Sequence, residues 1–449
     1  MDNLLLDAAT RADRYLKELN QRTVAPAPGA LKNLAGLDEP LPAGPTSAEL
    51  VIEMLDRIGS PSTAATAGRR FFGFVHGGSL PAALAANWLA GAWDQNAGLW
   101  ISSPIGATLE EITSRWLLEV LRLPKECGCG FVTGATMANF TALAAARSSV
   151  RERAGWDVEA EGLAGAPPVT VVVSEESHPS VLKSIGLLGL GRRKVLAVPT
   201  DGAGRIRMGQ FPKLAPPAIV CVQAGNVNTG SIDPVGEISA LAHSSGAWVH
   251  VDGAFGLWAA ASPALAHLVT GVEQADSWAT DAHKWLNVPY DSGLAFVRDA
   301  RALHRAMALT AAYIPVAERR DPGMYTPELS RRARGVEIWA ALRSLGRSGL
   351  AGLIERCCGH ARRFAEGLRT AGCQILNDVV LNQVLVSFGS PETTQRVIEQ
   401  IQRDGTCWCG VTKWQGRVAM RISVCNWATT EDDVDRSLAA ILAAKRQVG

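Results

Sequence analysis

The chain has 449 residues, of which 47% are hydrophobic and 19% are charged. A chain of this length can bury a large core and favours two domains. Its 44 basic and 43 acidic residues give a net charge of +1, without the basic excess typical of nucleic-acid-binding surfaces. We therefore expect no nucleic-acid partner.

The first residues, "MDNLLLDAATRADRYLKELNQ", predict an amphipathic helix rather than a secretory signal. They lack a basic start, and their apolar run is only "LLL". No apolar stretch of the chain approaches the ~20 residues of a membrane-spanning helix. These patterns indicate a cytoplasmic protein without a membrane partner. Residues 1–65 as a whole read as a helical extension that packs in a dimer.

Residues 66–345 form the predicted large domain, which begins with helices. Helical spacing of apolar residues predicts three of them, at 80–95, 108–123 and 137–155. The second has Glu110 and Glu111 in its expected first turn and Pro124 beyond its end.

Short runs rich in β-branched residues then alternate with helical stretches. They predict strands at 169–174, 194–199, 218–224 and 247–254, with "SWATD" and "LAFVRD" as the last. Continuous apolar strands that alternate with helices indicate a largely parallel α/β sheet covered on both faces. Residues 346–449 change rhythm and predict a smaller carboxy-terminal α/β domain.

Two patterns that could suggest other ligands are set aside. "GLLGLGRRK" (186–194) follows a helical run and has G-x-x-G-x-G spacing, whereas a dinucleotide fingerprint lies between a strand and a helix. The chain has nine cysteines, and the pairs Cys127/Cys129 and Cys407/Cys409 lack the C-x-x-C spacing of most zinc sites. We expect reduced thiols and no metal.

Four separate motifs carry the chemistry. "GFVTGATMANF" places Gly134, Ala135 and Thr136 at a helix start, where free N–H groups bind anions. Asp252 ends the buried strand of "AWVHVDGAFG", at the edge where open α/β sheets bind ligands. Each of these motifs alone also fits a capped helix or a structural ion pair.

The other two motifs supply a histidine and a lysine. His178 follows a strand in "VSEESHPSVLKS", and Lys284 lies between His283 and a tryptophan in "DSWATDAHKWLNVPYDSG". A buried lysine can form a Schiff base. Together the motifs match the needs of pyridoxal 5'-phosphate: N–H donors for its phosphate, an acid for its ring nitrogen, a stacking partner and an amine for its aldehyde.

These motifs, in this order, resemble the group II pyridoxal-phosphate-dependent decarboxylases, which include the aromatic L-amino acid, tyrosine and glutamate decarboxylases. The resemblance runs from "RRFFGFVHGGSLPAALAANWL" to "MRISVCNW". It implies a fold-type I transferase architecture, an intertwined homodimer and a small-molecule amino acid substrate.

The resemblance also implies residue roles. Lys284 would hold the cofactor as a Schiff base, Asp252 would pair with the ring nitrogen, and His178 and Ala254 would cover the two ring faces. The expected phosphate and polar contacts are Gly134, Ala135, Thr136, Asn226, Asn228 and His283. The expected substrate contacts are Phe74, His76, Trp100 and Arg421, with the Trp100 segment reaching in from the other subunit.

Two features depart from the family pattern. Asp281 stands where many members carry an asparagine, and a carboxylate there would repel the phosphate. We expect Asp281 to turn away or donors such as Thr280 to compensate. The family's mobile catalytic loop falls in 313–335, where Tyr325 best matches the proton-donating tyrosine; the other three tyrosines are Tyr15, Tyr290 and Tyr313.

The predicted function is decarboxylation of a neutral, aromatic L-amino acid to the amine and carbon dioxide, with Lys284, Tyr325 and His178 as catalytic residues. An aldehyde synthase that couples decarboxylation to oxidative deamination is an alternative. So is an aldol-type carbon–carbon lyase, which would use the same lysine and aspartate. A non-catalytic homologue would not need both Asp252 and Lys284.

Overall fold

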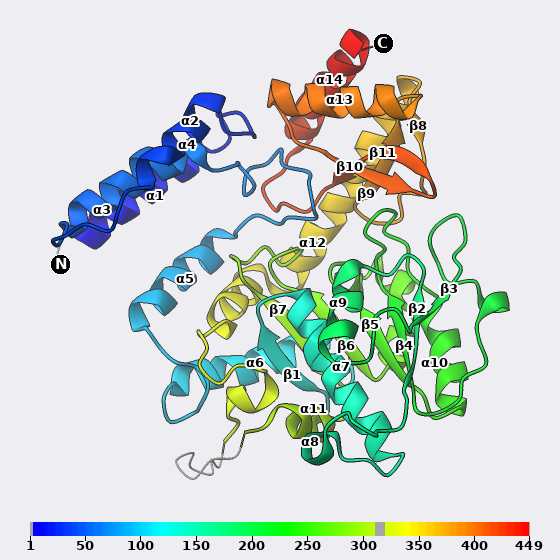
Figure 1. Cartoon of the computed structure of the whole chain (residues 1–449). Coiled ribbons are helices and arrows are strands. Elements are labelled where there is room, and N and C mark those ends of the chain that lie inside the picture. The colour runs from blue at the N-terminus through cyan, green and yellow to red at the C-terminus, as the bar shows by residue number, and fades with distance from the viewer. Residues whose placement is uncertain (1–2, 310–318, 449) are drawn as a thin grey trace. The chain divides into compact units, whose positions relative to one another are not determined.

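The computed structural model describes residues 3–309 and 319–448. The chain folds into two compact units. The small unit comprises residues 1–78, 360–376 and 384–449, and the large unit comprises 79–359 and 377–383. Figure 1 shows the elements of both units in chain order.

A seven-stranded sheet forms the centre of the large unit, in the order β1-β7-β6-β5-β4-β2-β3. The strands are β1 Gly128–Val132, β2 Thr170–Ser174, β3 Leu196–Val198, β4 Ala218–Gln223, β5 Trp248–Asp252, β6 Ser277–Asp281 and β7 Gly293–Val297. Strands β3, β2, β4, β5 and β6 pair in parallel, and β7 is antiparallel to both β6 and β1. The predicted, largely parallel sheet is confirmed.

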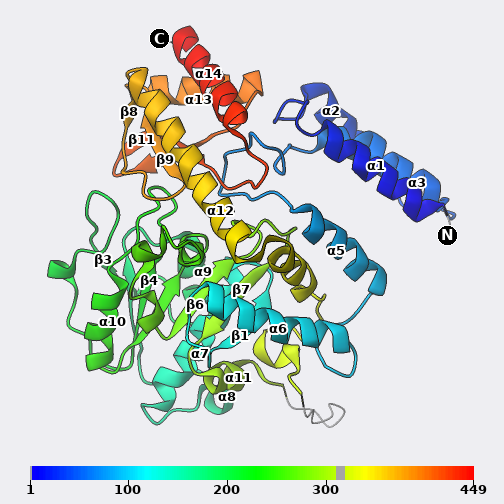
Figure 2. The same cartoon turned by 180° about the vertical axis from the view of Figure 1, so that it is seen from behind.

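Helices cover this sheet because its central strands are apolar on both faces. The helices of the large unit are α5 Pro81–Trp93, α6 Pro104–Val120, α7 Ala135–Glu152, α8 Val158–Glu161, α9 Pro179–Leu187, α10 Val235–Ser244 and α11 Ala300–Met307. Of these, α7, α10 and α11 pack directly on the strands. The two opposite views place α6 beside β1 and α10 beside the β3 and β4 side (Figures 1 and 2). The buried alanines of α7 lie in a core cluster with β2, β4 and β7, because small side chains let a helix approach a sheet closely.

Two predicted helix starts were too late. Helix α6 begins at Pro104, after Ser103, whose hydroxyl accepts a hydrogen bond from Gly106 N–H. Ser followed by Pro is a typical helix start, so Glu110 lies in the middle of α6 and not in its first turn. Helix α7 begins at Ala135, which brings the glycine-rich motif directly against its N-terminus.

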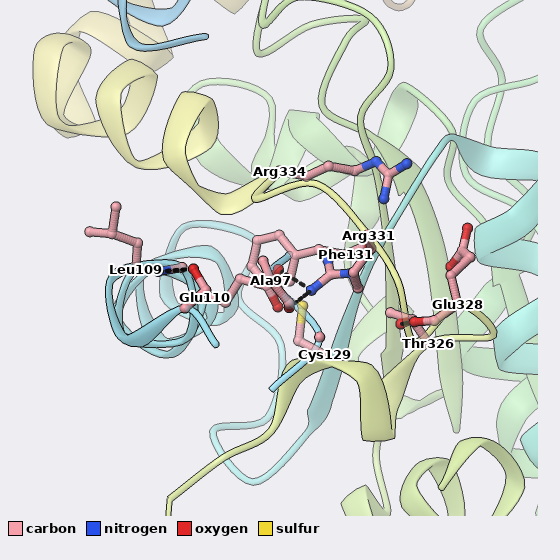
Figure 3. A network of polar contacts seen from close by, with 12 residues as sticks. Ala97, Leu109, Glu110, Cys129, Phe131, Thr326, Glu328, Arg331 and Arg334 are labelled. Atoms are coloured by element: carbon pink, nitrogen blue, oxygen red, sulfur yellow. Dashed lines mark hydrogen bonds and ion pairs between the residues drawn. The ribbon is translucent and has the colours of Figure 1, made fainter. Parts of the chain in front are cut away.

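A buried ion pair joins α6 to the segment before α12 (Gly335–Thr370). Arg331 Nη1 lies 2.6 Å from Glu110 Oε1, and their side chains are 0% and 1% exposed. Arg331 also donates to the carbonyl oxygens of Ala97 and Phe131, at 3.0 and 2.8 Å (Figure 3). These contacts anchor the segment to both α6 and the edge strand β1.

The small unit contains a four-stranded sheet in the order β10-β11-β9-β8. Its strands are β8 Gln374–Ile375, β9 Gln383–Ser387, β10 Gly410–Trp414 and β11 Arg417–Ser423. Its helices are α1 Leu4–Glu18, α2 Pro28–Asn33, α3 Ala48–Met54, α4 Ser60–Ser62, α13 Pro391–Asp404 and α14 Glu431–Val448. The predicted small α/β domain is therefore present.

The predicted domain boundaries differ from the observed units. The boundary at residues 345/346 coincides with a kink at Gly346, where φ is 60°, but α12 continues and the units divide after Gly359. Residues 66–78 belong to the small unit, because Arg70 pairs with Asp433 and Asn426 bonds to the carbonyl of Gly68. A dimer role for residues 1–65 stays a prediction.

Among residues 3–309 and 319–448, no helix has the length and hydropathy of a membrane span. All nine cysteines are free and buried.

Candidate active site

Several predicted cofactor residues of the large unit gather where β5, β6 and β1 end. Asp252 is the last residue of β5 and pairs in register with Ala279 of the neighbouring strand β6. Lys284 lies in the turn after β6, and Ala135 begins α7 just after β1. Because these strands run in the same direction, their carboxyl ends meet at one edge of the sheet.

Asp252 is buried, and its carboxylate accepts a hydrogen bond from Ala254 N–H at 3.2 Å. Burial raises the pKa of Asp252, while the nearby Lys284, and His178 whenever its ring is protonated, lower it. A buried acid beside this edge fits a cationic ring nitrogen, which would keep the carboxylate ionised.

Lys284 is held by a carboxylate inside the site. Its Nζ lies 2.9 Å from Asp281 Oδ2, and the lysine side chain is 19% exposed. The next two residues, Trp285 and Leu286, are fully buried and anchor the turn. The amine is therefore positioned by the core on one side and by Asp281 on the other.

The expectation that Asp281 turns away from the phosphate cradle is wrong for this structure. Asp281 Oδ1 accepts a hydrogen bond from Ala135 N–H at 2.6 Å, and His283 Nε2 lies 3.4 Å from the same oxygen. Thr280 does not compensate, because its hydroxyl donates to the carbonyl of Gly253. The carboxylate is attracted to the positive N-terminus of α7.

The expected phosphate cradle, Gly134, Ala135 and Thr136 at the start of α7, requires glycine because the backbones of Gly134 and Gly293 approach each other closely. A Cβ on Gly134 would lie 3.2 Å from His283 Cε1, and one on Gly293 would lie 2.4 Å from Gly134 Cα. Sequence reasoning missed Gly293, the glycine of "DSG" and the first residue of strand β7. Thr136 completes the first turn of α7, and its carbonyl accepts from Ser184 Oγ.

Two buried side-chain amides, at the end of β4 and just after it, show that the site fits a polar ligand. Asn226 Oδ1 accepts hydrogen bonds from the N–H groups of Asn228 and Thr229, which fix the orientation of the side chain. Asn226 Nδ2 and Gln223 Nε2 are buried and have no hydrogen-bond partner in the structure. Such donors are costly unless a ligand accepts from them, so this chemistry fits pyridoxal phosphate.

His178 caps the N-terminus of α9. Its Nδ1 lies 2.8 Å from Ser180 Oγ and accepts from Ser180 N–H at 3.2 Å. The residue is exposed in the single chain, and a proton on its ring would lower the pKa of Asp252, so it belongs to the same edge of the sheet. Ala254 lies two residues after Asp252 and is half-buried.

The tyrosines divide between the two ends of the sheet. The Tyr325 ring packs on His304 of α11, with ring centroids 5.6 Å apart, and Arg320 lies 3.7 Å above it. Helix α11 follows β7, which starts at Gly293 opposite Asp281 and runs away from the site. Tyr325 is therefore not brought to Lys284 within one chain, whereas Tyr290 stacks on His283 at 4.3 Å.

Two further parts of the predicted catalytic region lie apart from this edge. Tyr313 and the rest of residues 313–318 lie outside the described residues. Trp100 is half-buried. Its backbone N–H donates to Asp321 Oδ1 at 2.6 Å, and the Arg319 guanidinium lies 4.5 Å from the centre of its ring. Its role as a substrate contact stays a prediction. Tyr15, the fourth tyrosine, bonds to Thr63 in the small unit.

The remaining substrate candidates belong to the small unit. Arg421 lies in β11, and burial lowers its pKa. Phe71 stacks on Phe74, His76 and Trp408, and Phe74 also packs against His76 and Trp408, with centroid distances between 5.0 and 6.4 Å. Sequence reasoning missed Trp408, which is far away in the chain and has no local signal.

The parallel sheet, the lysine after β6, the acid at the end of β5 and the N–H cradle define a fold-type I pyridoxal-phosphate protein. The model of the pyridoxal-dependent decarboxylase conserved domain matches residues 28–389. This match covers most of the chain, so the protein belongs to that family.

Curated relatives agree with this assignment, and a solved structure shares the fold. The aromatic-L-amino-acid decarboxylase of Bacillus atrophaeus is 26% identical over 402 residues, covering 84% of this chain and 81% of the relative. The L-2,4-diaminobutyrate decarboxylase of Rhizobium meliloti (strain 1021) is 30% identical over 389 residues, covering 82% and 76%. The structure of Oryza sativa TDC with PLP and tryptamine has a TM-score of 0.90 and 22% identity, covering 99% and 97%.

Family membership confirms three expectations from the sequence. The protein is an amino acid decarboxylase, its cofactor is pyridoxal 5'-phosphate, and its architecture is that of fold type I. The relatives act on different amino acids, so membership alone does not name the substrate.

Proposed function

We propose that the protein decarboxylates a neutral, aromatic L-amino acid to its amine. The observation that carries this proposal is the aromatic cluster of Phe71, Phe74, His76 and Trp408. Trp408 stacks on Phe71 at 5.0 Å and on Phe74 at 5.2 Å. Stacked rings of this kind favour another aromatic ring over a charged side chain, and Phe74 is 57% exposed in the single chain.

The backbone of this segment supports a functional role. Phe74 and Val75 both have positive φ, at 53° and 59°, a conformation that costs free energy for residues other than glycine. A Cβ on Gly73 would lie 2.2 Å from Trp408 Cζ3, so Gly73 permits the indole to stack there. Strained backbone that holds exposed aromatic rings is typical of ligand sites.

The residues of the sheet edge would divide the work on the cofactor. Lys284 would bond to its aldehyde carbon, Asp252 would keep its ring nitrogen protonated, and the N–H groups at the start of α7 would bind its phosphate. When bound, pyridoxal phosphate supplies the electron sink for the bond that breaks. His178 and Ala254 would cover the two faces of the ring and orient the substrate.

A homodimer is part of this proposal. Several large apolar side chains of the large unit are exposed in the single chain; they are Trp88, Leu89, Trp93, Ile101 and Ile105. Apolar residues grouped in this way are typical of subunit interfaces. Because Tyr325 is remote from Lys284 within one chain, its proton-donor role would require the partner subunit, whereas His178 can act in its own chain.

The test is to incubate the purified protein and pyridoxal phosphate with a panel of L-amino acids, and to measure carbon dioxide, amine and aldehyde together. We expect carbon dioxide and equimolar amine from aromatic substrates. Aldehyde with ammonia would indicate an aldehyde synthase, and cleavage of β-hydroxy amino acids without carbon dioxide would indicate a lyase. Turnover of diaminobutyrate or glutamate alone would overturn the substrate proposal.

Two variants control this assay. Lys284→Ala should retain its fold and lose both turnover and the bound chromophore, and normal turnover would refute the role of Lys284. Trp408→Ala should raise KM for aromatic substrates, while Trp414→Ala, a change in the neighbouring strand β10, should leave KM unchanged.

A further inference from the structure

A chain of buried hydrogen bonds runs from the core of the large unit to His178. Trp248, His250 and Asp252 are alternate residues of β5 and therefore share one face of the strand. On the same side, Ser277 of β6 pairs in register with His250. Asp252 serves the cofactor, whereas the other three have no role in the reaction described so far.

The hydrogen bonds connect four elements. Ser277 Oγ lies 2.8 Å from Trp248 Nε1 and 2.9 Å from His250 Nδ1. His250 Nε2 lies 2.8 Å from Asn139 Oδ1 on α7. Asn139 Nδ2 lies 3.4 Å from Ser180 Oγ, which in turn lies 2.8 Å from His178 Nδ1.

The direction of this chain follows from the acceptor atom of Asn139. The amide oxygen Asn139 Oδ1 can only accept, so His250 Nε2 carries a proton and donates it to Asn139. The Nδ1 of a neutral His250 then accepts from Ser277 Oγ–H, and Ser277 Oγ accepts from the indole N–H of Trp248. Asn139 Nδ2 donates to Ser180 Oγ, and Ser180 Oγ–H points to His178 Nδ1, which also accepts from Ser180 N–H.

The neutral state of His250 is required for this direction. His250, Asn139 and Ser277 are fully buried, and burial lowers the pKa of His250 to about 3. A second donor, Ser180 N–H, also points at His178 Nδ1, at 3.2 Å. Both donors therefore favour an unprotonated Nδ1 on His178.

We propose that Ser277, His250 and Asn139 are positioning residues that hold His178 as the tautomer protonated at Nε2. His178 then acts at the site as a hydrogen-bond donor through Nε2, suited to an anionic oxygen such as the substrate carboxylate. It does not act as a base, because its Nδ1 lone pair is engaged by Ser180. This inference rests on the proposed role of His178 beside the cofactor, but the tautomer is a property of the protein alone.

The experiment labels the full-length protein with nitrogen-15 histidine and records long-range proton–nitrogen spectra, with and without pyridoxal phosphate. The chain has eight histidines, and His178→Gln assigns the His178 signals. In the wild-type protein we expect a protonated Nε2 and an unprotonated Nδ1. A protonated Nδ1 on neutral His178 would overturn the proposal without any variant.

Variants separate the hydrogen-bond chain from the local cap. Asn139→Leu removes the donor to Ser180, and the minor tautomer protonated at Nδ1 should increase about fivefold, the effect of one ordinary hydrogen bond. Ser184→Ala is the matched control. Ser184 is a buried serine of α9, the helix that also carries Ser180, and its hydroxyl donates to the backbone carbonyls of Thr136 and Ser180. Equal tautomer populations in wild type and a folded Asn139→Leu protein would show that the chain has no effect.

The same variants give a kinetic readout that distinguishes this inference from the proposed function. Asn139→Leu should lower kcat/KM severalfold on whichever amino acid is turned over, and Ser184→Ala should not. If the panel of L-amino acids shows that the substrate is not aromatic, the proposed function is refuted, and the tautomer of His178 is unaffected.

Discussion

The large unit contains two buried ion pairs with the same chemistry and different surroundings. Arg331 and Glu110 are 2.6 Å apart and almost fully buried, and Arg331 is also bonded to two backbone carbonyls. Lys284 and Asp281 are 2.9 Å apart, and the lysine side chain is 19% exposed. The first pair joins α6, β1 and the segment before α12, whereas the second lies at the cofactor end of the sheet.

The difference shows how the same interaction can serve stability or function. A guanidinium remains charged and can fill several acceptors at once, so the Arg331 pair is permanent. A lysine amine can lose its proton, and a carboxylate at a helix N-terminus can be replaced by a phosphate. With the proposed role of Lys284, the Lys284–Asp281 pair is therefore one that the cofactor would take apart.

Breaking the permanent pair should have the largest effect. Arg331→Met leaves Glu110 buried without its partner and should lower the free energy of unfolding by about 3–5 kcal/mol. Urea denaturation measures this loss from the unfolding transition of the large unit. Arg115→Met is the control, because Arg115 and Glu111 form an exposed pair on the same helix α6, which should contribute less than about 0.5 kcal/mol.

The double variant Glu110→Leu with Arg331→Met distinguishes charge from packing. Removing both charges avoids the unpaired carboxylate, so much of the lost stability should return. If the double variant is less stable than Arg331→Met, Glu110 stabilises the fold without Arg331, through the nearby charges of Arg320 and Arg334.

His250 is a buried polar residue without charge, and its contribution to the free energy of unfolding should depend on pH. Its pKa in the folded protein is about 3, below the value of about 6.5 in an unfolded chain. The unfolded state therefore takes up the proton first, so the stabilisation is complete above pH 6.5 and is lost as pH falls toward 3. The loss should approach about 1.4 kcal/mol per pH unit within this window.

The measurement compares wild type with His250→Gln between pH 6.5 and 4.5. The difference in unfolding free energy between the two proteins should shrink by about 2–3 kcal/mol over these two units. A difference that is independent of pH would mean that water or a charged neighbour lets His250 take up its proton in the folded state.

The contrast between these regions also explains what the sequence could predict. The sheet and the ends of its strands followed from apolar runs that alternate with helical stretches, and Lys284, Asp252 and Gly134 followed from local motifs with a common chemistry. Asn139 and Trp408 were out of reach, because their roles depend on partners more than a hundred residues away, His250 and Phe71. No periodicity encodes such contacts.

Other features had a signal that was available and not used. Ser103 and Pro104 mark the start of α6 and would have placed Glu110 in the helix middle. The alternation of Trp248, His250 and Asp252 along one strand face would have placed His250 behind the site. The behaviour of Asp281 needed the structure, because a carboxylate can either avoid a phosphate site or occupy it.

The smallest expected effect concerns the Lys284–Asp281 pair. Asp281 Oδ1 accepts from Ala135 N–H, one of the donors that the phosphate requires, and a carboxylate close to a phosphate repels it. Asp281→Asn should therefore tighten the binding of pyridoxal phosphate about tenfold, equivalent to about 1.4 kcal/mol. Fluorescence titration of the cofactor-free protein measures the dissociation constant.

Asp291→Asn is the matched control, because Asp291 lies in the connection between β6 and β7 and pairs with Arg334 at 2.8 Å, without contacting the start of α7 among the described residues. Its dissociation constant should match that of the wild type. Weaker binding by Asp281→Asn would mean that the carboxylate positions Lys284 for the cofactor more than it competes with the phosphate. In that case both buried pairs are structural, and the difference between them lies only in their exposure.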